Sequence, residues 1–355
     1  MKMKFEKNTP KSLRYRMPAE WEPQEAVWLC WPHNKETWAK ILPEVEETYA
    51  EFVKAIHNGQ KIKILVNDED AKIKAQAKLK KADVNLSQVI FYKIKTIDAW
   101  IRDYGPTFVL SPKLKQKLAI VKWNFNAWGN KYEELKEDNS VPYEIKKHID
   151  INFFEPKIFL EGGSIEVNGS GTVLTTEQCL LNKNRNPRLS KLDIEDYLKE
   201  YLNVSNILWL KKGIEGDDTD GHIDDIARFV SRNTVVCAFE ENKDDENHKI
   251  LKQNYELLKN MKDENANNLN VVKLPMPGFV CDDRNKKIRV PASYANFYIG
   301  NSAVAVPVFG DKKDKKALRI LSRLFPGRNV VGINCKEMVC GLGALHCASQ
   351  QEPKV

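Results

Sequence analysis

The chain has 355 residues, of which 42% are hydrophobic and 30% charged, a composition typical of a globular protein with a sizeable core. Its net charge of +7 comes from 56 basic and 49 acidic residues, a modest excess. The lysines are spread along the chain without the clustered arginines and interleaved aromatics of a nucleic-acid-binding surface, which argues against nucleic acid as a partner.

Seven cysteines are present, an odd number at wide spacings and without a CxxC pair. This pattern resembles neither a disulfide framework nor a zinc ribbon. The first residues lack the apolar stretch of a signal peptide, and the chain has no run of about 18 apolar residues that could span a membrane. We therefore expect a protein of the reducing cytoplasm with no membrane partner.

Short apolar or β-branched runs, typical of strands, alternate with longer amphipathic runs, typical of helices. The predicted strands are Ala26–Trp31, Lys61–Val66, Val89–Lys93, Thr107–Leu110, Leu118–Asn124, Ser164–Val167, Thr172–Thr175, Asn206–Leu210, Ile226–Val230, Thr234–Phe239, Asn270–Lys273, Phe297–Val308 (two strands about Gly300) and Val330–Asn334. The predicted helices are Lys35–Ile56, Asp70–Lys81, Leu192–Leu202, Glu246–Lys262 and Lys313–Leu324.

A strand–helix–strand unit recurs about five times in this prediction, without a residue-level repeat. An open α/β sheet, an α+β pair of domains and a ring of small α/β units all fit the recurrence. No Pro/Gly/Ser linker or break in composition marks a boundary, so we expect a single domain over residues 1–355.

The segment DAWIRDYGP, residues 98–106, ends in a Tyr-Gly-Pro turn. We expect extended backbone before it, so the turn must bend to bring Trp100 and Asp103 to one pocket. A tryptophan face and a carboxylate together suit a planar cation, through cation–π contact and charge-assisted hydrogen bonds. The alternative is a buried tryptophan beside an ion pair of Arg102 with a carboxylate.

Residues 160–175, LEGGSIEVNGSGTVLT, place Glu161 immediately before a pair of glycines. The apolar runs on either side of Asn-Gly-Ser-Gly predict a β-hairpin. A hairpin explains the glycines but not the glutamate, which is therefore a candidate functional acid.

The segment GDDTDGHIDDIARFV, residues 216–230, is rich in acids around one histidine. If residues 221–230 are extended, His222 and Asp224 point to one face and Asp225 to the other. The surrounding acids form a negative loop suited to a cation; they are Asp217, Asp218, Asp220 and Asp225. A metal site on His222, Asp224 and Asp225 is a competing hypothesis, and a turn with solvent-facing acids is another.

The segment GLGALHCASQQEP, residues 341–353, places Cys347 after a glycine-rich turn, where a substrate can approach closely. A thiol is a useful nucleophile only as thiolate, which needs a nearby positive charge or hydrogen-bond donors. The adjacent His346 need not be its partner, because neighbouring residues of a strand face opposite sides. An inert buried cysteine is the alternative.

Six segments, in order, resemble the agmatine deiminase / bacterial peptidyl-arginine deiminase family of the guanidino-group-modifying superfamily. They are MPAEWEPQEAVWLCWP (17–32), DAWIRDYGP (98–106), residues 160–187, residues 216–230, ASYANFYIGNSAVAVPVFG (292–310) and GLGALHCASQQEP (341–353). The resemblance covers nearly the whole chain. It implies an α/β fold of the pentein type, a pseudo-fivefold α/β propeller with the active site in its central channel.

The resemblance also implies the catalytic residues. Cys347 is then the nucleophile and His222 the general acid/base, which Glu161 holds. Attack by the thiolate leaves a thiouronium on Cys347, and water activated by His222 releases the ureido product. One imidazole serves first as acid and then as base, so it should titrate near neutrality. No metal and no other cofactor is expected.

For substrate binding, the resemblance implies that Asp103 and Asp224 grip the guanidinium, with Trp100 and Asn296 lining the pocket. Two carboxylates that clamp the N–H groups of a guanidinium fix its orientation and favour its charged form. A small-molecule guanidinium substrate is thus the expected partner.

Some residues depart from the family pattern, whose last motif commonly reads GGGNIHCITQQEP. Leu342 replaces a glycine, Ala344 a small or polar residue, and Ser349 a threonine. The first two are expected to narrow or reshape the substrate channel. We find no arginine to clamp the carboxylate of arginine or of a peptide, which favours agmatine, converted to N-carbamoylputrescine and ammonia for polyamine (putrescine) biosynthesis.

Three alternatives remain open. The same residues could deiminate free or peptidyl arginine to citrulline. A metal-dependent hydrolase built on His222, Asp224 and Asp225 would lose activity with a chelator and keep it in Cys347→Ser. A polyamine-binding module without turnover is the third, although a binder has no use for the thiol. The oligomeric state is open, and a homo-oligomer is one option.

Overall fold

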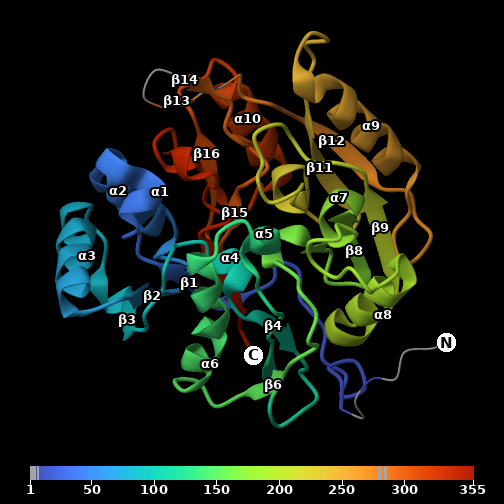
Figure 1. The fold of residues 1–355 in the computed structure, drawn as a ribbon, viewed down its shortest axis with the longest axis horizontal. Helices are drawn as coiled ribbons and strands as arrows, with labels where there is room; N and C mark the ends of the chain where they lie inside the picture. Colours follow the sequence, from blue (N-terminus) through green and yellow to red (C-terminus); the bar gives the residue numbers. More distant parts are fainter. Residues whose placement is uncertain (1–4, 6–7, 279–280, 284–285) are drawn as a thin grey trace.

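The computed structural model describes residues 5, 8–278, 281–283 and 286–355, and of residues 281–283, 286 and 287 it describes the backbone alone. The expectation that the first residues form no signal peptide concerns residues that lie partly outside these ranges. Within them, the strands form mixed sheets, and five sheets share one internal order (Figure 1). In each, one strand pairs antiparallel with a second, and the second pairs parallel with a third.

The strands are short and lie in the following sheets. The first sheet has the order β18-β1-β2-β3, with β18 at Ser349–Pro353, β1 at Gln24–Cys30, β2 at Lys61–Val66 and β3 at Val89–Lys93. The second contains β4 (Thr107–Leu110), β5 (Leu118–Val121) and β6 (Asn152–Phe154), and the third contains β7 (Glu166–Val167), β8 (Thr172–Thr176) and β9 (Asn206–Leu210). The fourth contains β10 (Ala227–Phe229), β11 (Thr234–Phe239) and β12 (Asn270–Pro275), and the fifth contains β15 (Tyr298–Ile299), β16 (Ala303–Val308) and β17 (Asn329–Asn334). A hairpin of β13 (Cys281–Asp283) and β14 (Lys286–Ile288) stands apart from them.

Helices connect the parallel strands of each sheet, as parallel pairing requires. They are α2 (Leu42–Ile56), α3 (Glu69–Lys81), α6 (Val141–Lys146), α8 (Lys191–Leu202), α9 (Glu246–Asn260) and α10 (Asp314–Leu324). Figure 1 shows them around the outside of the view, with α4 (Ile101–Tyr104) and α5 (Ala127–Asn130) near its centre. The remaining short helices are α1 (Lys35–Trp38) and α7 (Glu177–Leu180), and the 3₁₀ turns are η1 (Ala39–Ile41), η2 (Leu86–Gln88), η3 (Glu134–Ser140), η4 (Gly162–Ser164), η5 (Ile223–Asp225) and η6 (Met338–Gly341).

Helix α8 shows how local sequence sets these elements. Ser190 and Asp193 form a capping box, in which each side chain bonds the other's backbone N–H. The helix ends at Asn203 in the left-handed conformation, with φ 57°. Its buried face consists of Ile194, Leu198, Tyr201 and Leu202. The predicted Leu192–Leu202 is confirmed, because cap, apolar spacing and stop signal all agree.

One predicted helix is wrong in its extent. Lys35–Ile56 divides into α1, η1 and α2, with Ala39 at φ 34° between the first two. Pro43 has no N–H to continue a helix from before it and stands in the first turn of α2 instead. The predicted strand Leu118–Asn124 likewise stops at Val121, and the short strand β6 was not predicted.

The apolar core follows the sheets from one to the next. One cluster joins apolar side chains of the first, second and fifth sheets and includes Val236 and Leu274 of the fourth. A second lies between the second and third sheets under α8, and a third lies between the third and fourth sheets under α9. Each sheet therefore shares an apolar cluster with at least one neighbouring sheet.

The cysteines mostly serve this interior. Five of them are free and buried: Cys30, Cys179, Cys237, Cys335 and Cys347. Cys340 is disulfide-bonded, which the cysteine spacing did not lead us to expect. In the described ranges, we find no helix with the length and apolar character needed to cross a membrane.

Candidate active site

Five polar residues that the sequence analysis singled out lie in the segments that lead into one strand of each of the five sheets. Asp103 lies just before β4, Glu161 before β7, His222 before β10, Asn296 before β15, and Cys347 before β18. Each therefore stands at the entry to the first strand of its sheet. Direct contacts, given below, bring these segments together although 244 residues separate the first from the last.

The segment around Asp103 is a helical turn and not extended as expected. Ile101–Tyr104 forms α4, so Trp100 and Asp103, three residues apart, lie on one side of the turn without further bending. Arg102 has no carboxylate partner in the described residues; it donates to the carbonyl of His346 and to Gln351 Oε1 at 3.2 and 2.7 Å. It thereby ties α4 to the segment that carries the thiol.

The carboxylate of Asp103 is fixed by two donors. The backbone N–H of Gly163 donates to Oδ1 and the indole N–H of Trp128 donates to Oδ2, both at 2.9 Å. Burial raises the pKa of Asp103 to about 6, although the neighbouring His222 lowers it. Trp128 stands in no recognisable sequence motif, and its role in orienting Asp103 follows only from this hydrogen bond.

Two acids of the loop before His222 form hydrogen bonds and ion pairs within the protein. Asp217 accepts the backbone N–H groups of Thr219, Gly221 and His222, at 2.7, 2.8 and 3.2 Å. Asp220 pairs with Lys131 and Arg185. Backbone amides and basic side chains therefore occupy two of the four acids expected to form a negative loop, whereas Asp218 lines the cavity that reaches the thiol.

The residues after His222 turn instead of extending. Ile223–Asp225 is the 3₁₀ turn η5, and the strand begins only at Ala227. The alternation expected for an extended segment therefore does not apply. His222 and Asp224 nevertheless face one place, since a Cβ built at Gly163 would lie 2.6 Å from His222 Nδ1 and 3.1 Å from Asp224 Oδ2.

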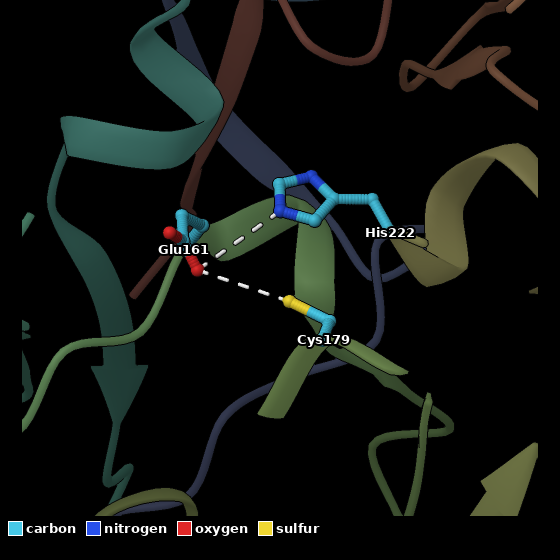
Figure 2. Close-up of side chains that lie close together, drawn as sticks. All are labelled: Glu161, Cys179 and His222. Carbon is cyan, nitrogen blue, oxygen red and sulfur yellow. Dashed lines mark hydrogen bonds and ion pairs between the residues drawn. The ribbon is translucent and has the colours of Figure 1, made fainter. Parts of the chain in front are cut away.

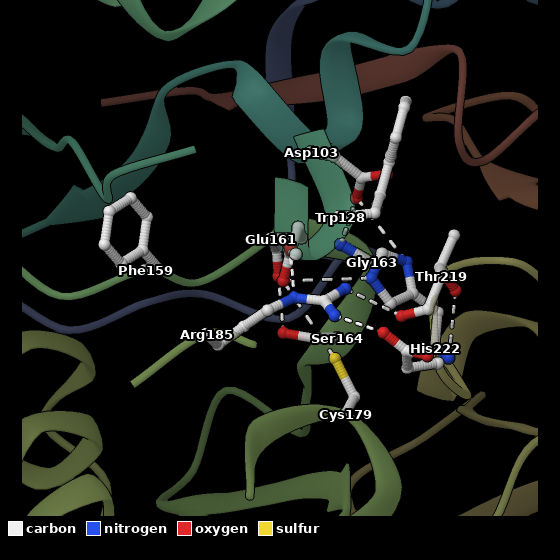
Figure 3. Close-up of polar contacts among 12 residues, drawn as sticks. Asp103, Trp128, Phe159, Glu161, Gly163, Ser164, Cys179, Arg185, Thr219 and His222 are labelled. Atoms are coloured by element: carbon white, nitrogen blue, oxygen red, sulfur yellow. Dashed lines mark hydrogen bonds and ion pairs between the residues drawn. The ribbon is translucent and has the colours of Figure 1, made fainter. Parts of the chain in front are cut away.

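The His222 ring is buried between the carboxylates of Glu161 (Figure 2) and Asp103 (Figure 3). Its Nδ1 lies 3.7 Å from Asp103 Oδ1, and its Nε2 lies 4.0 Å from Glu161 Oε2. Neither ring nitrogen has a hydrogen-bond partner among the residues that the structure describes. Burial lowers the pKa of His222, but Asp103, Cys179 and Asp224 outweigh burial and raise it well above the ordinary value. The pKa of His222 is therefore shifted upward from the near-neutral value that we expected.

Glu161 is held mainly by an arginine that the sequence analysis did not single out. Arg185 Nε donates to Glu161 Oε1 at 2.8 Å, and Figure 3 shows the Arg185 guanidinium between Glu161 and Thr219, whose carbonyl accepts from it at 2.8 Å. Both charged side chains are fully buried. Arg185 lies within the family-like segment of residues 160–187, and that position was the only feature of the sequence that could have marked it as a site residue.

Asp224 is held by His346. Its Oδ2 lies 2.7 Å from His346 Nδ1, and His346 Nε2 lies 3.2 Å from Glu20 Oε2 on the other side of the ring. Burial alone would raise the pKa of Asp224, but the hydrogen bond and charge of His346 outweigh it and lower the pKa. Asp224 is therefore ionised. Its Oδ1 is buried and has no hydrogen-bond partner among the described residues.

Asn296 positions the thiol. Its Nδ2 donates to Cys347 Sγ at 3.1 Å and to Asp225 Oδ1 at 3.0 Å, and its Oδ1 accepts the backbone N–H of Cys347 at 3.3 Å. Asn296 thus contacts the sulfur directly, and its place in the substrate pocket, which the resemblance implies, stays a prediction. Burial and the charges of Asp224 and Asp225 raise the pKa of Cys347 well above its ordinary value.

A cavity of about 290 Å³ reaches the thiol. Trp100 and Leu342 line it, whereas Ala344 is buried and is not among its lining residues. Five of its lining residues are acids: Glu36, Asp98, Asp103, Glu134 and Asp218. No lysine or arginine is among the described residues that line it. Leu342 adopts the left-handed conformation with φ 68°, where a glycine is unstrained.

The comparisons with known proteins agree over the full length of the chain. The model of the Porphyromonas-type peptidyl-arginine deiminase family matches residues 16–353. The agmatine deiminase of Medicago truncatula is 37% identical over 377 residues, covering 98% of this chain and 99% of that protein. The structure of the Enterococcus faecalis agmatine deiminase matches with a TM-score of 0.90 at 35% identity, covering 98% of both chains. A cysteine-to-serine variant of C. jejuni agmatine deiminase with substrate bound matches with a TM-score of 0.85 at 33% identity, covering 96% of both chains.

Proposed function

Because this chain belongs to the Porphyromonas-type peptidyl-arginine deiminase family, we propose that it hydrolyses the guanidinium group of agmatine to N-carbamoylputrescine and ammonia. Relatives of similar length that are named agmatine deiminase support this choice. One observation of this chain carries it: a thiol and two carboxylates meet at one end of a cavity lined by acids and by no described lysine or arginine.

That lining favours agmatine over arginine. Agmatine carries a second cation where arginine carries an ammonium and a carboxylate. A carboxylate about 6 Å from another repels it by roughly 3 kcal/mol at an effective dielectric constant of about 20. A single acid of the wall thus supplies about a hundredfold discrimination against a substrate carboxylate.

The guanidinium is bound by Asp103 and Asp224. Asp103 receives its orientation from Gly163 and Trp128, and Asp224 from His346. Asp224 Oδ1, which has no hydrogen-bond partner among the described residues, is the natural acceptor for a guanidinium N–H. Trp100 supplies an aromatic wall beside the cation.

The substrate itself activates the thiol. Before binding, burial and the neighbouring carboxylates keep Cys347 protonated, because they raise its pKa. A bound guanidinium neutralises Asp224, whose Oδ2 lies 3.7 Å from Sγ, and so lowers the thiol pKa. The N–H of Asn296 stabilises the thiolate that forms.

His222 then carries protons for both half-reactions. The proton of the Cys347 thiol passes to solvent, and the thiolate Sγ attacks the central guanidinium carbon. The protonated His222 gives its proton to the departing ammonia, which leaves a thiouronium on the sulfur and takes up one proton from solvent to become ammonium. The neutral imidazole next takes a proton from water, which attacks the same carbon and releases the ureido product and the thiol. Its Nδ1, which faces Asp103 and the place beside Gly163, is the nitrogen on the substrate side. Glu161 supports the ring from the Nε2 side.

The wider setting of the reaction is also a proposal. We take residues 1–355 as one catalytic domain, a pentein-type propeller of five α/β units around a central channel. The shared strand order of the five sheets and the equivalent positions of the five site residues support this arrangement. The product is one hydrolysis from putrescine, which places the reaction in polyamine biosynthesis. Location in the cytoplasm and a homo-oligomeric state stay predictions.

The test is ammonia release from agmatine and from L-arginine, measured side by side with and without EDTA. The variants are wild type, Cys347→Ser, and Cys237→Ser as a matched control, since Cys237 is a free buried cysteine in a strand of the fourth sheet. We expect kcat/KM for agmatine about a hundredfold above that for arginine. We also expect no effect of EDTA and loss of turnover only in Cys347→Ser.

Each other result has a definite meaning. Turnover that survives in Cys347→Ser overturns the covalent mechanism. Loss of activity with EDTA alone points to the metal-dependent alternative. A preference for arginine keeps the mechanism and overturns the choice of substrate.

A further inference from the structure

We propose that Glu161, Cys179 and His222 form an inhibitory site for a thiophilic divalent cation such as Zn²⁺, on the Nε2 side of the His222 ring. Figure 2 shows the three side chains pointing toward one another from segments that are far apart in sequence. Only the kinetic part of the inference rests on the function proposed above, because cation binding can be measured without turnover.

The distances suit one small cation. The three donor atoms lie within 4.8 Å of one another, and Glu161 Oε2 is 4.0 Å from both Cys179 Sγ and His222 Nε2. Zinc bonds of about 2.0 to 2.3 Å in tetrahedral geometry place ligand atoms about 3.4 to 3.6 Å apart. Side-chain shifts of about half an ångström therefore bring all three donors to bonding distance.

The donors are also the right kind and are available. Imidazole nitrogen, thiolate sulfur and carboxylate oxygen are the ligands that zinc prefers. His222 is 1% exposed, and its Nε2, directed at Glu161, has no hydrogen-bond partner among the described residues. A buried nitrogen without a partner is unusual and costly, which sets this cluster apart from an ordinary packed cysteine.

The charges around the cluster permit a cation. The positive side chain of Arg185 contacts Glu161, but its Nε bonds Oε1 and leaves Oε2 to the cluster. Asp220 balances the charge of Arg185 as a second ion-pair partner. The cation displaces one proton from Cys179 Sγ and one from His222 Nε2, and both protons go to solvent, so the bound site gains no net charge.

Binding there blocks catalysis without blocking the substrate. A cation on Nε2 fixes the ring and keeps it as a metal-bound imidazole. The proton that remains on Nδ1 is much less acidic than that of an imidazolium, so His222 can no longer give it to the leaving ammonia. Asp103 and Asp224 lie on the Nδ1 side and stay free to hold a guanidinium. Inhibition should therefore lower kcat and leave KM for agmatine unchanged.

A second cluster offers the contrasting outcome. Asp224, Asp225 and Cys347 also hold three donor atoms within 4.8 Å of one another. A cation there occupies the guanidinium clamp and the nucleophile. Its inhibition is competitive with agmatine, and its binding is lost in Cys347→Ser.

The experiment measures zinc in two ways. Equilibrium dialysis measures Zn²⁺ binding to wild type, Cys179→Ser and Cys347→Ser in a non-chelating buffer. Circular dichroism shows whether each protein is folded. If Cys179→Ser is not folded, Cys179→Ala takes its place. Inhibition of agmatine hydrolysis by Zn²⁺ uses wild type, Cys179→Ser and the Cys237→Ser control, each relative to its own uninhibited rate.

We expect one tightly bound zinc in wild type and in Cys347→Ser, and at least tenfold weaker binding in Cys179→Ser. The inhibition constant should rise at least tenfold in Cys179→Ser and stay unchanged in Cys237→Ser. Equal zinc affinity in wild type and Cys179→Ser overturns the inference, as does inhibition that is competitive with agmatine. If agmatine is not a substrate, the dialysis alone still decides between the two clusters.

Discussion

A single methyl group at Gly163 should separate the chemistry of the site from the stability of the fold. The Cβ of Gly163→Ala would lie 2.6 Å from His222 Nδ1, 2.9 Å from Asp103 Oδ1 and 3.1 Å from Asp224 Oδ2. Gly163 is not among the glycines with positive φ, so its backbone accepts alanine, and its N–H still donates to Asp103. The effect therefore comes from displaced side chains alone.

The size of the effect follows from that displacement. Ordinary contact begins near 3.4 Å, so the His222 ring must move away by roughly 0.8 Å and the Asp103 carboxylate by roughly 0.5 Å. A misplacement of about 1 Å costs on the order of a hundredfold in rate. Overpacking of this kind costs about 1 to 3 kcal/mol of unfolding free energy, which a chain of this size tolerates.

Steady-state ammonia release from agmatine and urea unfolding of the same preparations check this prediction. Gly327→Ala is the matched control, because Gly327 has no atom within 4 Å of an added Cβ and no positive φ. It should keep wild-type kcat/KM. A folded Gly163→Ala protein with more than half of the wild-type kcat/KM would refute the assignment of the guanidinium site to this place.

Three further predictions concern charge and backbone. Because Asp103 must be ionised to bind a guanidinium and burial raises its pKa to about 6, kcat/KM should fall about tenfold per pH unit below that pH; a profile that stays flat down to pH 5 contradicts this. Leu342 has φ 68°, so Leu342→Gly should be about 1 kcal/mol more stable than Leu342→Ala in urea unfolding, the reverse of the usual order of glycine and alanine; equal stabilities would show that the backbone there is unstrained. Burial alone would raise the pKa of Glu20, but Arg228 and His346 outweigh it and lower the pKa from 4.5 to about 2. The stabilisation is then complete above pH 4.5 and lost toward pH 2, so Glu20→Gln should cost about 3 kcal/mol at pH 7 and little near pH 2, and a cost independent of pH in chemical unfolding would contradict the shift.

Regular elements were predictable because each has its own local pattern. Lys61–Val66, Val89–Lys93 and Thr234–Phe239 have the predicted bounds, since apolar and β-branched runs bounded by polar residues favour buried strands. The one-turn helix around Asp103 and the 3₁₀ turn after His222 were predicted as extended. A single turn is shorter than the window over which a helical period can be recognised.

The site residues divide in the same way. Asp103, Glu161, His222 and Cys347 stand in dense motifs that mark them as chemical, and the structure brings their segments together. The support around them was not visible, because it consists of contacts between distant segments. His346 reaches Asp224 across 122 residues, and no local pattern can signal such a pair.

The pairing of β18 with β1 has a consequence for synthesis. During translation, β1 emerges early and can join β2, which follows about 30 residues later, but its other edge stays bare until residues 349–353 leave the ribosome. A bare edge that carries Ala26–Cys30 is a template for pairing with another nascent chain. The same late docking brings in Cys347, two residues ahead of β18. Arrival of the nucleophile and closure of the exposed edge of β1 should therefore occur in one step, when β18 docks.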